Sequence, residues 1–144
     1  MHLSIAHESS KVNLAFLIKE LGLRQEKNTT VFRKGNFFVI SPSVQNQYNW
    51  FDIGESIMES YNPKVHEGYL LVRFKEKYVV AKLQPFQKKM MLRETMPNTT
   101  KLRPHWKFKV IEAGDPHVIN MGNSDLKFRI QMPSETQLIK FFNK

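Results

Sequence analysis

The alternation of apolar and polar residues is clearest in the second half of the chain. Residues 69–74 and 78–83 are two apolar stretches joined by Lys75-Glu76-Lys77, a pattern that predicts a β-hairpin with a tight polar loop. Residues 106–112 alternate apolar side chains with lysines, as expected of a strand that buries one face. This half of the chain is therefore predicted to form antiparallel sheet.

A further hairpin and a closing helix are predicted after residue 112. Residues 117–121 and 126–131 flank Gly122-Asn123-Ser124-Asp125, whose residue types favour a turn. Ser134-Glu135-Thr136-Gln137 follows, in which the serine can cap a helix and the glutamine can return a bond to the backbone. This capping box predicts a helix that extends through Phe142.

The first half of the chain mixes helical and extended patterns. An apolar stripe predicts a helix over residues 9–21. Residues 31–40 are aromatic and β-branched and are interrupted by Lys34-Gly35-Asn36, a predicted turn. Residues 48–53 are typical of a short strand, and residues 54–61 of a short helix.

Together these elements predict an α+β fold. About seven short strands follow one another without regularly alternating helices, which favours a mostly antiparallel, seven-stranded open β-barrel (a pseudobarrel) with two or three short helices. A chain of 144 residues has a common size for one domain, so we expect residues 1–144 to form a single domain.

The amino-acid composition excludes several kinds of functional site. The chain has no cysteine, which excludes disulfides, thiolate zinc sites and thiol catalysis and favours a reducing cytoplasm. No apolar run approaches the roughly 18 residues of a membrane span, so we expect no membrane partner. The histidines lack metal-ligand spacing and no glycine-rich phosphate loop is present, so we expect no cofactor, metal or catalytic residue.

The positive charge is concentrated in residues 69–109. The protein carries a formal net charge of +9, and this segment accounts for the whole excess, with eleven lysines and arginines against Glu76 and Glu94. Such local asymmetry indicates a surface that meets a polyanion, and nucleic acid is the expected partner. A solvated face on two strands and a loop is the alternative.

Two polar segments supply candidate contacts with nucleic acid. Residues 84–105 have no steady period and contain three prolines, so we expect a long loop whose arginines, lysines and amides contact phosphates or base edges. The candidates there are Lys88, Lys89, Arg93, Asn98, Thr99, Lys101 and Arg103. Lys75 and Lys77, on the neighbouring hairpin turn, are expected to touch only the phosphate backbone. A mobile loop without a partner is the alternative.

The second polar segment covers residues 24–30 and continues into the next strand. It has the same residue chemistry and also leads into a strand, although an ordinary helix–strand connector would look similar. Its candidates are Arg24, Gln25, Lys27, Asn28, Thr29 and Arg33.

Two nuclease alternatives and an RNA-binding domain stay open. A metal-dependent nuclease needs two carboxylates and a lysine; Asp52 and Lys82 fit in part, but Val80 stands where the second acid belongs. His105 and Lys107 approximate the His-x-Lys-x4-Asp element of phospholipase D-like phosphodiesterases, which use two copies of it.

The layout resembles a known family of DNA-binding domains. The Asn49-Trp50-Phe51-Asp52-Ile53 strand with its short helix, the two polar arms and the closing helix resemble the B3-like DNA-binding pseudobarrel over about residues 23–144. This domain serves as the recognition domain of EcoRII-, BfiI- and LlaJI-type restriction endonucleases. The helix predicted at residues 11–21 departs from the family, which usually opens with a strand.

The resemblance implies a function and a mechanism. In the family, two arms grip the DNA and read bases in the major groove; here the N-arm would be residues 24–33 and the C-arm residues 88–103. We therefore expect a sequence-specific double-stranded DNA-binding module that recognises the target of a restriction-modification system. A cleavage domain or subunit of the same system would cut the DNA, and the chain itself would not be catalytic.

Overall fold

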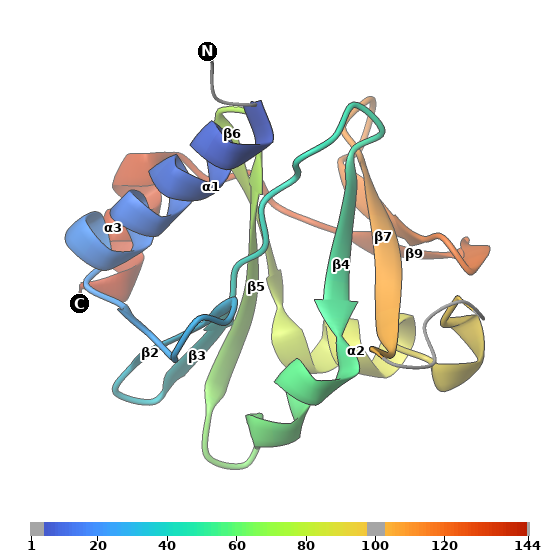
Figure 1. Ribbon diagram of the computed structural model, residues 1–144, viewed down its shortest axis with the longest axis horizontal. Coiled ribbons are helices and arrows are strands. Elements are labelled where there is room, and N and C mark those ends of the chain that lie inside the picture. Colours follow the sequence, from blue (N-terminus) through green and yellow to red (C-terminus); the bar gives the residue numbers. More distant parts are fainter. Residues whose placement is uncertain (1–4, 98–102, 144) are drawn as a thin grey trace.

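The computed structural model describes residues 5–97 and 103–143 and has three layers. Figure 1 shows two β-sheets side by side, with α1 (Ile5–Ala15) and α3 (Glu135–Phe142) against the outer face of one of them. We call that sheet A and the other sheet B. The helices therefore form the first layer, sheet A the second and sheet B the third.

Sheet A is five-stranded, with the order β1-β2-β3-β5-β6. All its neighbouring strands are antiparallel except β3 and β5, which run parallel. Gly35, at a φ of 56°, occupies the left-handed conformation that the tight β2–β3 turn requires. The strands are β1 (Arg24–Gln25), β2 (Val31–Lys34), β3 (Phe37–Ile40), β5 (Glu67–Phe74) and β6 (Lys77–Lys82).

Sheet B is four-stranded and antiparallel throughout, with the order β4-β7-β8-β9. In β7, buried and half-exposed residues alternate strictly, so one face packs on the core and the other faces outward. The strands are β4 (Trp50–Gly54), β7 (His105–Ile111), β8 (His117–Asn120) and β9 (Asn123–Arg129).

Two apolar clusters hold the layers together. One lies between the sheets and includes Phe38, Phe74 and Phe108. The other packs the helices against the outer face of sheet A and includes Leu17 and Phe142, both fully buried. Each face of sheet A is thus covered by apolar contacts.

The remaining helices are short. α1 continues as a π-helical stretch (Phe16–Glu20), and two 3-10 helices (Glu55–Ser60 and Arg93–Thr95) precede β5 and β7. The helix α2 (Leu83–Met90) follows β6 directly. It buries Leu83, Phe86 and Met90 in the core between the sheets, where Phe86 packs edge-on against Phe108.

The structure confirms the α+β class and refines the predicted strands. It has nine strands in two sheets where the sequence predicted seven in one open barrel, and no closed barrel is formed by residues 5–97 and 103–143. The predicted β5–β6 hairpin is confirmed. So is the capping box, in which the Ser134 side chain accepts from the Gln137 N–H and the Gln137 side chain accepts from the Ser134 N–H.

The prediction of a continuous loop over residues 84–105 was wrong. Its first part is α2, and the 3-10 helix Arg93–Thr95 follows soon afterwards. Pro85, one of the three prolines of this segment, lies in the first turn of α2, where no intrahelical donor is needed. The helix expected over residues 9–21 likewise begins earlier, at Ile5.

Candidate nucleic-acid interface

The predicted N-arm is the loop of the β1–β2 hairpin, and Thr29 fixes its shape. The Thr29 hydroxyl donates to the Glu26 carbonyl oxygen (2.6 Å) and accepts from the Val31 N–H (3.1 Å). The Gln25 amide donates to the Thr29 carbonyl oxygen (2.9 Å). The loop is therefore held by its own hydrogen bonds.

Arg33 braces the same hairpin from the adjacent strand. Its Nη1 lies 3.2 Å from the Glu26 carboxylate, and its Nε donates to the Phe37 carbonyl oxygen (3.1 Å). Its guanidinium also lies over the Phe38 ring, 5.4 Å from the centroid. With these contacts Arg33 supports the loop and has few donors left for a ligand.

Three other N-arm residues face solvent. Arg24, Lys27 and Asn28 are exposed, and none of them makes a side-chain hydrogen bond or ion pair with the described part of the chain. Lys27 has a positive φ of 49°, which turns the chain at the tip of the loop. The hydrogen-bonded loop thus exposes two long cationic side chains and one amide side chain, whose hydrogen-bond donors have no partner in the described structure.

The structure separates the candidates of the predicted C-arm. Lys88 and Lys89 are exposed on α2, and Arg93 forms an ion pair with Glu55. Arg103 is exposed and lies just before β7. Asn98, Thr99 and Lys101 lie outside the described residues.

The first part of the C-arm is anchored by the buried side chain of Asn120. Its amide donates to the Met90 carbonyl oxygen (2.8 Å) and to the Thr95 hydroxyl (2.9 Å). The Trp106 indole donates to the Leu92 carbonyl oxygen (2.9 Å). Residues 90–95 are therefore fixed to sheet B.

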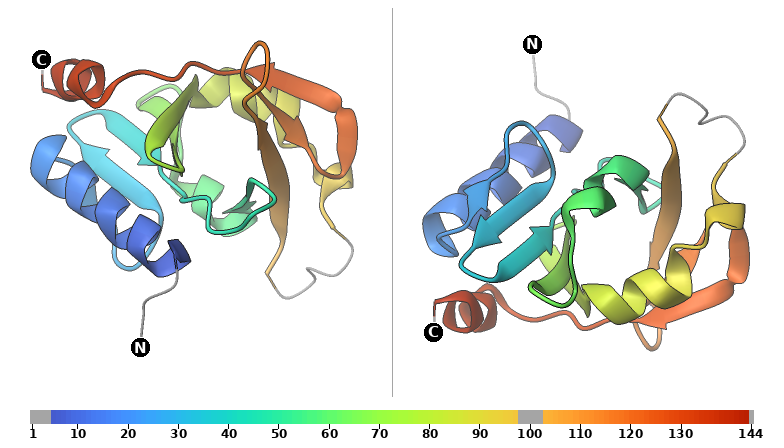
Figure 2. Two further views of the ribbon diagram at one scale, coloured as in Figure 1. Left: turned by 90° about the horizontal axis from the view of Figure 1, so that it is seen from above. Right: turned by 90° about the horizontal axis from the view of Figure 1, so that it is seen from below.

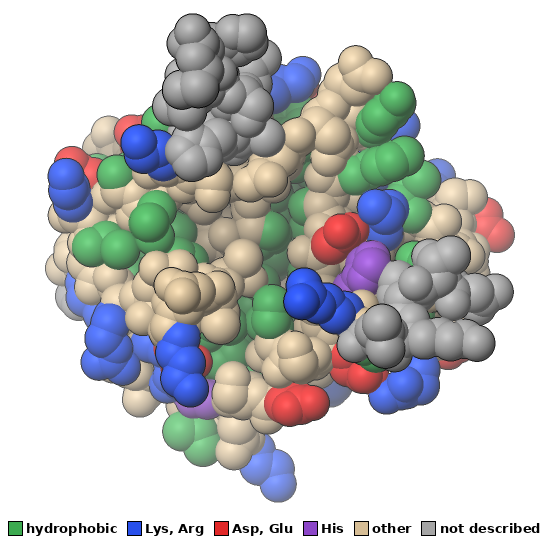
Figure 3. Space-filling view, in the orientation of Figure 1, with side chains coloured by type: hydrophobic (Ala, Val, Ile, Leu, Met, Phe, Trp, Pro, Cys, Tyr) green, Lys and Arg blue, Asp and Glu red, His purple; other side chains and the backbone are tan. Residues whose placement is uncertain are grey.

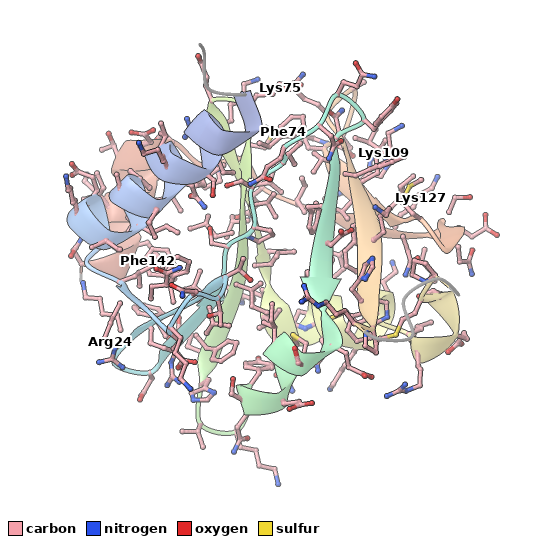
Figure 4. All side chains as sticks on the ribbon, viewed as in Figure 1. Arg24, Phe74, Lys75, Lys109, Lys127 and Phe142 are labelled. Carbon is pink, nitrogen blue, oxygen red and sulfur yellow. The ribbon has the colours of Figure 1, made fainter. Side chains whose placement is uncertain are left out.

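Lys75 and Lys77 share one acidic partner. Their ammonium groups lie 3.5 Å and 2.5 Å from the Glu112 carboxylate. The hydrogen bond from Lys77 and the charges of both lysines lower the pKa of Glu112. Figure 4 shows Lys75 and Arg24 at opposite ends of the molecule, so this turn does not adjoin the N-arm.

The candidate residues do not form one continuous patch. Figure 2 places α2, with Lys88 and Lys89, on the opposite side of the molecule from the β1–β2 hairpin. Figure 3 shows Lys and Arg side chains in separate groups on the face in view. A ligand that touches the N-arm therefore meets only part of the predicted set.

Tertiary contacts also neutralise part of the basic segment. Acids from other parts of the chain pair with some of its cations, and the rest have no acidic partner among the described residues. The paired cations are Arg73, Lys75, Lys77, Arg93 and Lys107, and the unpaired ones are Lys82, Lys88, Lys89, Arg103 and Lys109.

The structure brings together residues from the two nuclease alternatives. The Asp52 carboxylate on β4 lies 3.5 Å from Lys107 Nζ and 3.9 Å from His105 Nε2, both on β7. Lys82 belongs to the other sheet, where it lines a groove of about 790 Å³ beside α3. In the sequence analysis Asp52 and His105 belong to two different nuclease alternatives. The sequence contains no signal for the register of β4 against β7, which brings them together.

Comparison of the chain with protein-family models, curated proteins and solved structures found no match. No helix within the described ranges is long and apolar enough to cross a membrane. The described residues also contain no group of three or more His, Asp or Glu side chains placed to hold a metal ion.

Proposed function

We propose that this protein binds double-stranded DNA at a specific sequence through two arms in the major groove. The scaffold would be a B3-like pseudobarrel, and the protein would be the target-recognition module of a restriction-modification system. DNA cleavage would belong to a separate domain or subunit.

The observation that carries the proposal is the braced β1–β2 hairpin. Base edges are read by donor-rich side chains that a rigid element places in the groove, and the major groove is wide enough for a two-stranded ribbon. Thr29 and Arg33 fix the hairpin, whereas Arg24, Lys27 and Asn28 remain exposed and unpaired in the described structure. The loop thus has both the rigidity and the donors that readout requires.

The anchored start of the second arm also supports the proposal. Asn120 and Trp106 hold residues 90–95 against sheet B, and the chain enters β7 at His105, two residues after Arg103. Both ends of the C-arm therefore begin from fixed positions, as required of a loop that must enter a groove in one orientation.

A seam between the two sheets favours the pseudobarrel. Val80 of β6 exchanges two backbone hydrogen bonds (2.8 and 3.1 Å) with Gln131, which follows β9. The strands thereby continue from sheet A into sheet B along this edge. A bridge between the edge strands of two sheets is a feature that an open pseudobarrel would have, and it supports the proposal.

The test is a binding screen over all single-base variants of the preferred site. We expect Arg24→Ala to relax the preference at a single base pair, because a bidentate arginine–guanine contact is worth about 1–3 kcal/mol of discrimination. Binding to random duplex should change little. A Lys19→Ala/Lys140→Ala variant, altered on exposed helical positions, should retain the wild-type profile.

A uniform loss of affinity in Arg24→Ala, with an unchanged profile, would show that the N-arm holds only the backbone. Competition with duplex RNA and with single strands separates DNA recognition from the RNA-binding alternative.

A phosphodiesterase is the second candidate function, favoured by the contact of Asp52 with His105 and Lys107. We expect plasmid DNA to remain intact during incubation with Mg²⁺ or Mn²⁺. A metal-dependent nuclease needs two carboxylates on the metal, and among the described residues Asp52 belongs to no group of three or more metal-ligating side chains. Cleavage that disappears in Asp52→Ala or His105→Ala would make the enzyme the better assignment.

A further inference from the structure

The outer face of sheet B carries an aromatic pair in which Tyr48 is exposed and Trp50 is half-buried. Tyr48 stacks on Trp50 with ring centroids 4.6 Å apart and an angle of 25° between the planes. Tyr48 remains 51% exposed, so the stack is open to solvent. The pair is thus available as a platform on which a further flat ring can stack.

The local backbone fixes this pair in place. The Asn46 carboxamide oxygen accepts from the N–H groups of Tyr48 (2.9 Å) and Trp50 (3.0 Å). Its amide nitrogen donates to the Trp50 carbonyl oxygen (2.9 Å). One asparagine therefore holds both ends of the Tyr48–Trp50 segment, and the rings lose little freedom when a ligand stacks on them.

Three lysines lie on the same face of sheet B as the aromatic pair. Strand register aligns Trp50, Lys109, Ile119 and Lys127 in one row across the four strands. Lys109 and Lys127 have no acidic partner within the described chain, and Figure 4 shows them near one another on this side. Lys107, held by Asp52, lies with its Nζ 5.0 Å from the Trp50 ring centroid. The row contains two cations and no acid.

We propose that this face binds single-stranded DNA, with an unpaired base stacked on Tyr48 and phosphates against Lys109 and Lys127. Aromatic side chains bind bases through their π-faces, which a duplex covers and a single strand exposes, and lysines neutralise the backbone. The choice of DNA rests on the proposed function. The strand β7, which carries Lys109, follows the C-arm directly along the chain.

The experiment measures anisotropy of a fluorescein-labelled dT12 oligonucleotide titrated with the full chain. Tyr48→Ala should weaken binding by about 5- to 150-fold, the range expected for loss of one base–aromatic stack. Tyr48→Phe keeps the ring and should bind within about twofold of wild type. In a Trp106→Phe background Trp50 becomes the single tryptophan, and the oligonucleotide should change its fluorescence.

The lysines are tested through the salt dependence of the same binding. Lys109→Ala/Lys127→Ala should make the slope of log K against log salt shallower by about 1.4, because each phosphate contact to a single strand contributes about 0.7. The matched Lys19→Ala/Lys140→Ala variant removes the same charge from the helices and should leave this slope unchanged.

Duplex and single-strand binding are separated by the two sets of variants. Arg24→Ala/Lys27→Ala should lose duplex affinity and retain dT12 binding, whereas Tyr48→Ala should do the reverse. Equal dT12 affinity in wild type and Tyr48→Ala, with folding verified by circular dichroism, would overturn this inference without affecting the duplex proposal. Tighter binding of rU12 that is lost in Tyr48→Ala would overturn the assignment to DNA.

Discussion

Thr29 and Lys27 lie two residues apart in the N-arm but have different roles. The Thr29 hydroxyl makes two hydrogen bonds within the loop, whereas the Lys27 side chain makes none with the described residues. Their sequence context is equally polar, so composition alone could not separate them. Only the contacts show which residue supports the loop and which is available to a ligand.

Replacing Thr29 with valine should destabilise the protein and also weaken DNA binding. The change removes hydrogen bonds to Glu26 and Val31 while keeping the branched shape, and two such bonds are together worth about 1–2 kcal/mol. Urea unfolding measures the stability, and duplex titration measures the affinity. Thr29→Ser keeps the hydroxyl and should remain close to wild type; an equal loss in both variants would contradict this account.

Tyr78 should make the fold sensitive to alkaline pH. Burial raises its pKa to about 12, with Arg73 partly opposing the shift, and its hydroxyl donates to Asn13 Oδ1 (2.8 Å). Because the folded pKa lies above the unfolded value near 10, its contribution is complete below pH 10 and is lost as the pH rises through 12.

The measurement is the free energy of unfolding in urea between pH 9 and pH 12. Tyr78→Phe should be less stable at pH 9, because Asn13 loses a partner, and its stability should fall less steeply above pH 10. Parallel pH curves for the two proteins would show that another group causes the alkaline loss.

At the scale of elements, Gly122 controls how closely the β8–β9 turn approaches the start of the C-arm. A Cβ on Gly122 would lie 2.0 Å from the Thr95 carbonyl oxygen, so alanine must displace that backbone. We expect Gly122→Ala to lower the free energy of unfolding by about 1–3 kcal/mol and to weaken duplex binding, because residues 93–95 would shift.

Gly54→Ala is the matched control. Its Cβ would lie 3.9 Å from the nearest atom, a side-chain carbon of Ile57, which is an ordinary contact. Urea unfolding and duplex titration of both variants test the prediction. If Gly122→Ala were as stable as Gly54→Ala, the β8–β9 turn would accommodate the added Cβ without displacing residues 93–95 of the C-arm.

Local elements could be predicted from the sequence, and their pairing could not. The β5–β6 hairpin and the Ser134 capping box depend on neighbouring residues, so the pattern was sufficient. The parallel pairing of β3 with β5 joins segments about 30 residues apart and leaves no local signal. The helix α2 was missed because Pro85 masked the Leu83, Phe86 and Met90 pattern.

The residue types of the candidate site could be predicted from the sequence, but their contacts could not. The charge excess of residues 69–109 is visible in the sequence, but the acids that pair with it come from outside that segment: Asp52, Glu55, Glu112 and Glu135. The stacking of Tyr48 on Trp50 has no signal in the sequence, because it depends on which face of sheet B points outward.

At the scale of the whole molecule, the net charge of +9 is distributed over several surfaces. The N-arm carries Arg24 and Lys27, the outer face of sheet B carries Lys109 and Lys127, and α2 carries its lysines on the far side. Such a distribution attracts a polyanion from many directions, whereas tight contact involves only one surface at a time.

The number of contacts between cations and phosphates can be measured from the salt dependence of duplex binding. If about five cations meet phosphates, log K should fall with log salt with a slope of about −4 to −5, since each contact contributes about 0.9. Arg24→Ala/Lys27→Ala should make the slope shallower by up to about 1.8, the full amount if both residues meet phosphates. The Lys19→Ala/Lys140→Ala protein has the same net charge as that variant and should keep the wild-type slope. Equal slopes in all three proteins would show that Arg24 and Lys27 do not meet phosphates, and a flat response would exclude nucleic acid as the main partner.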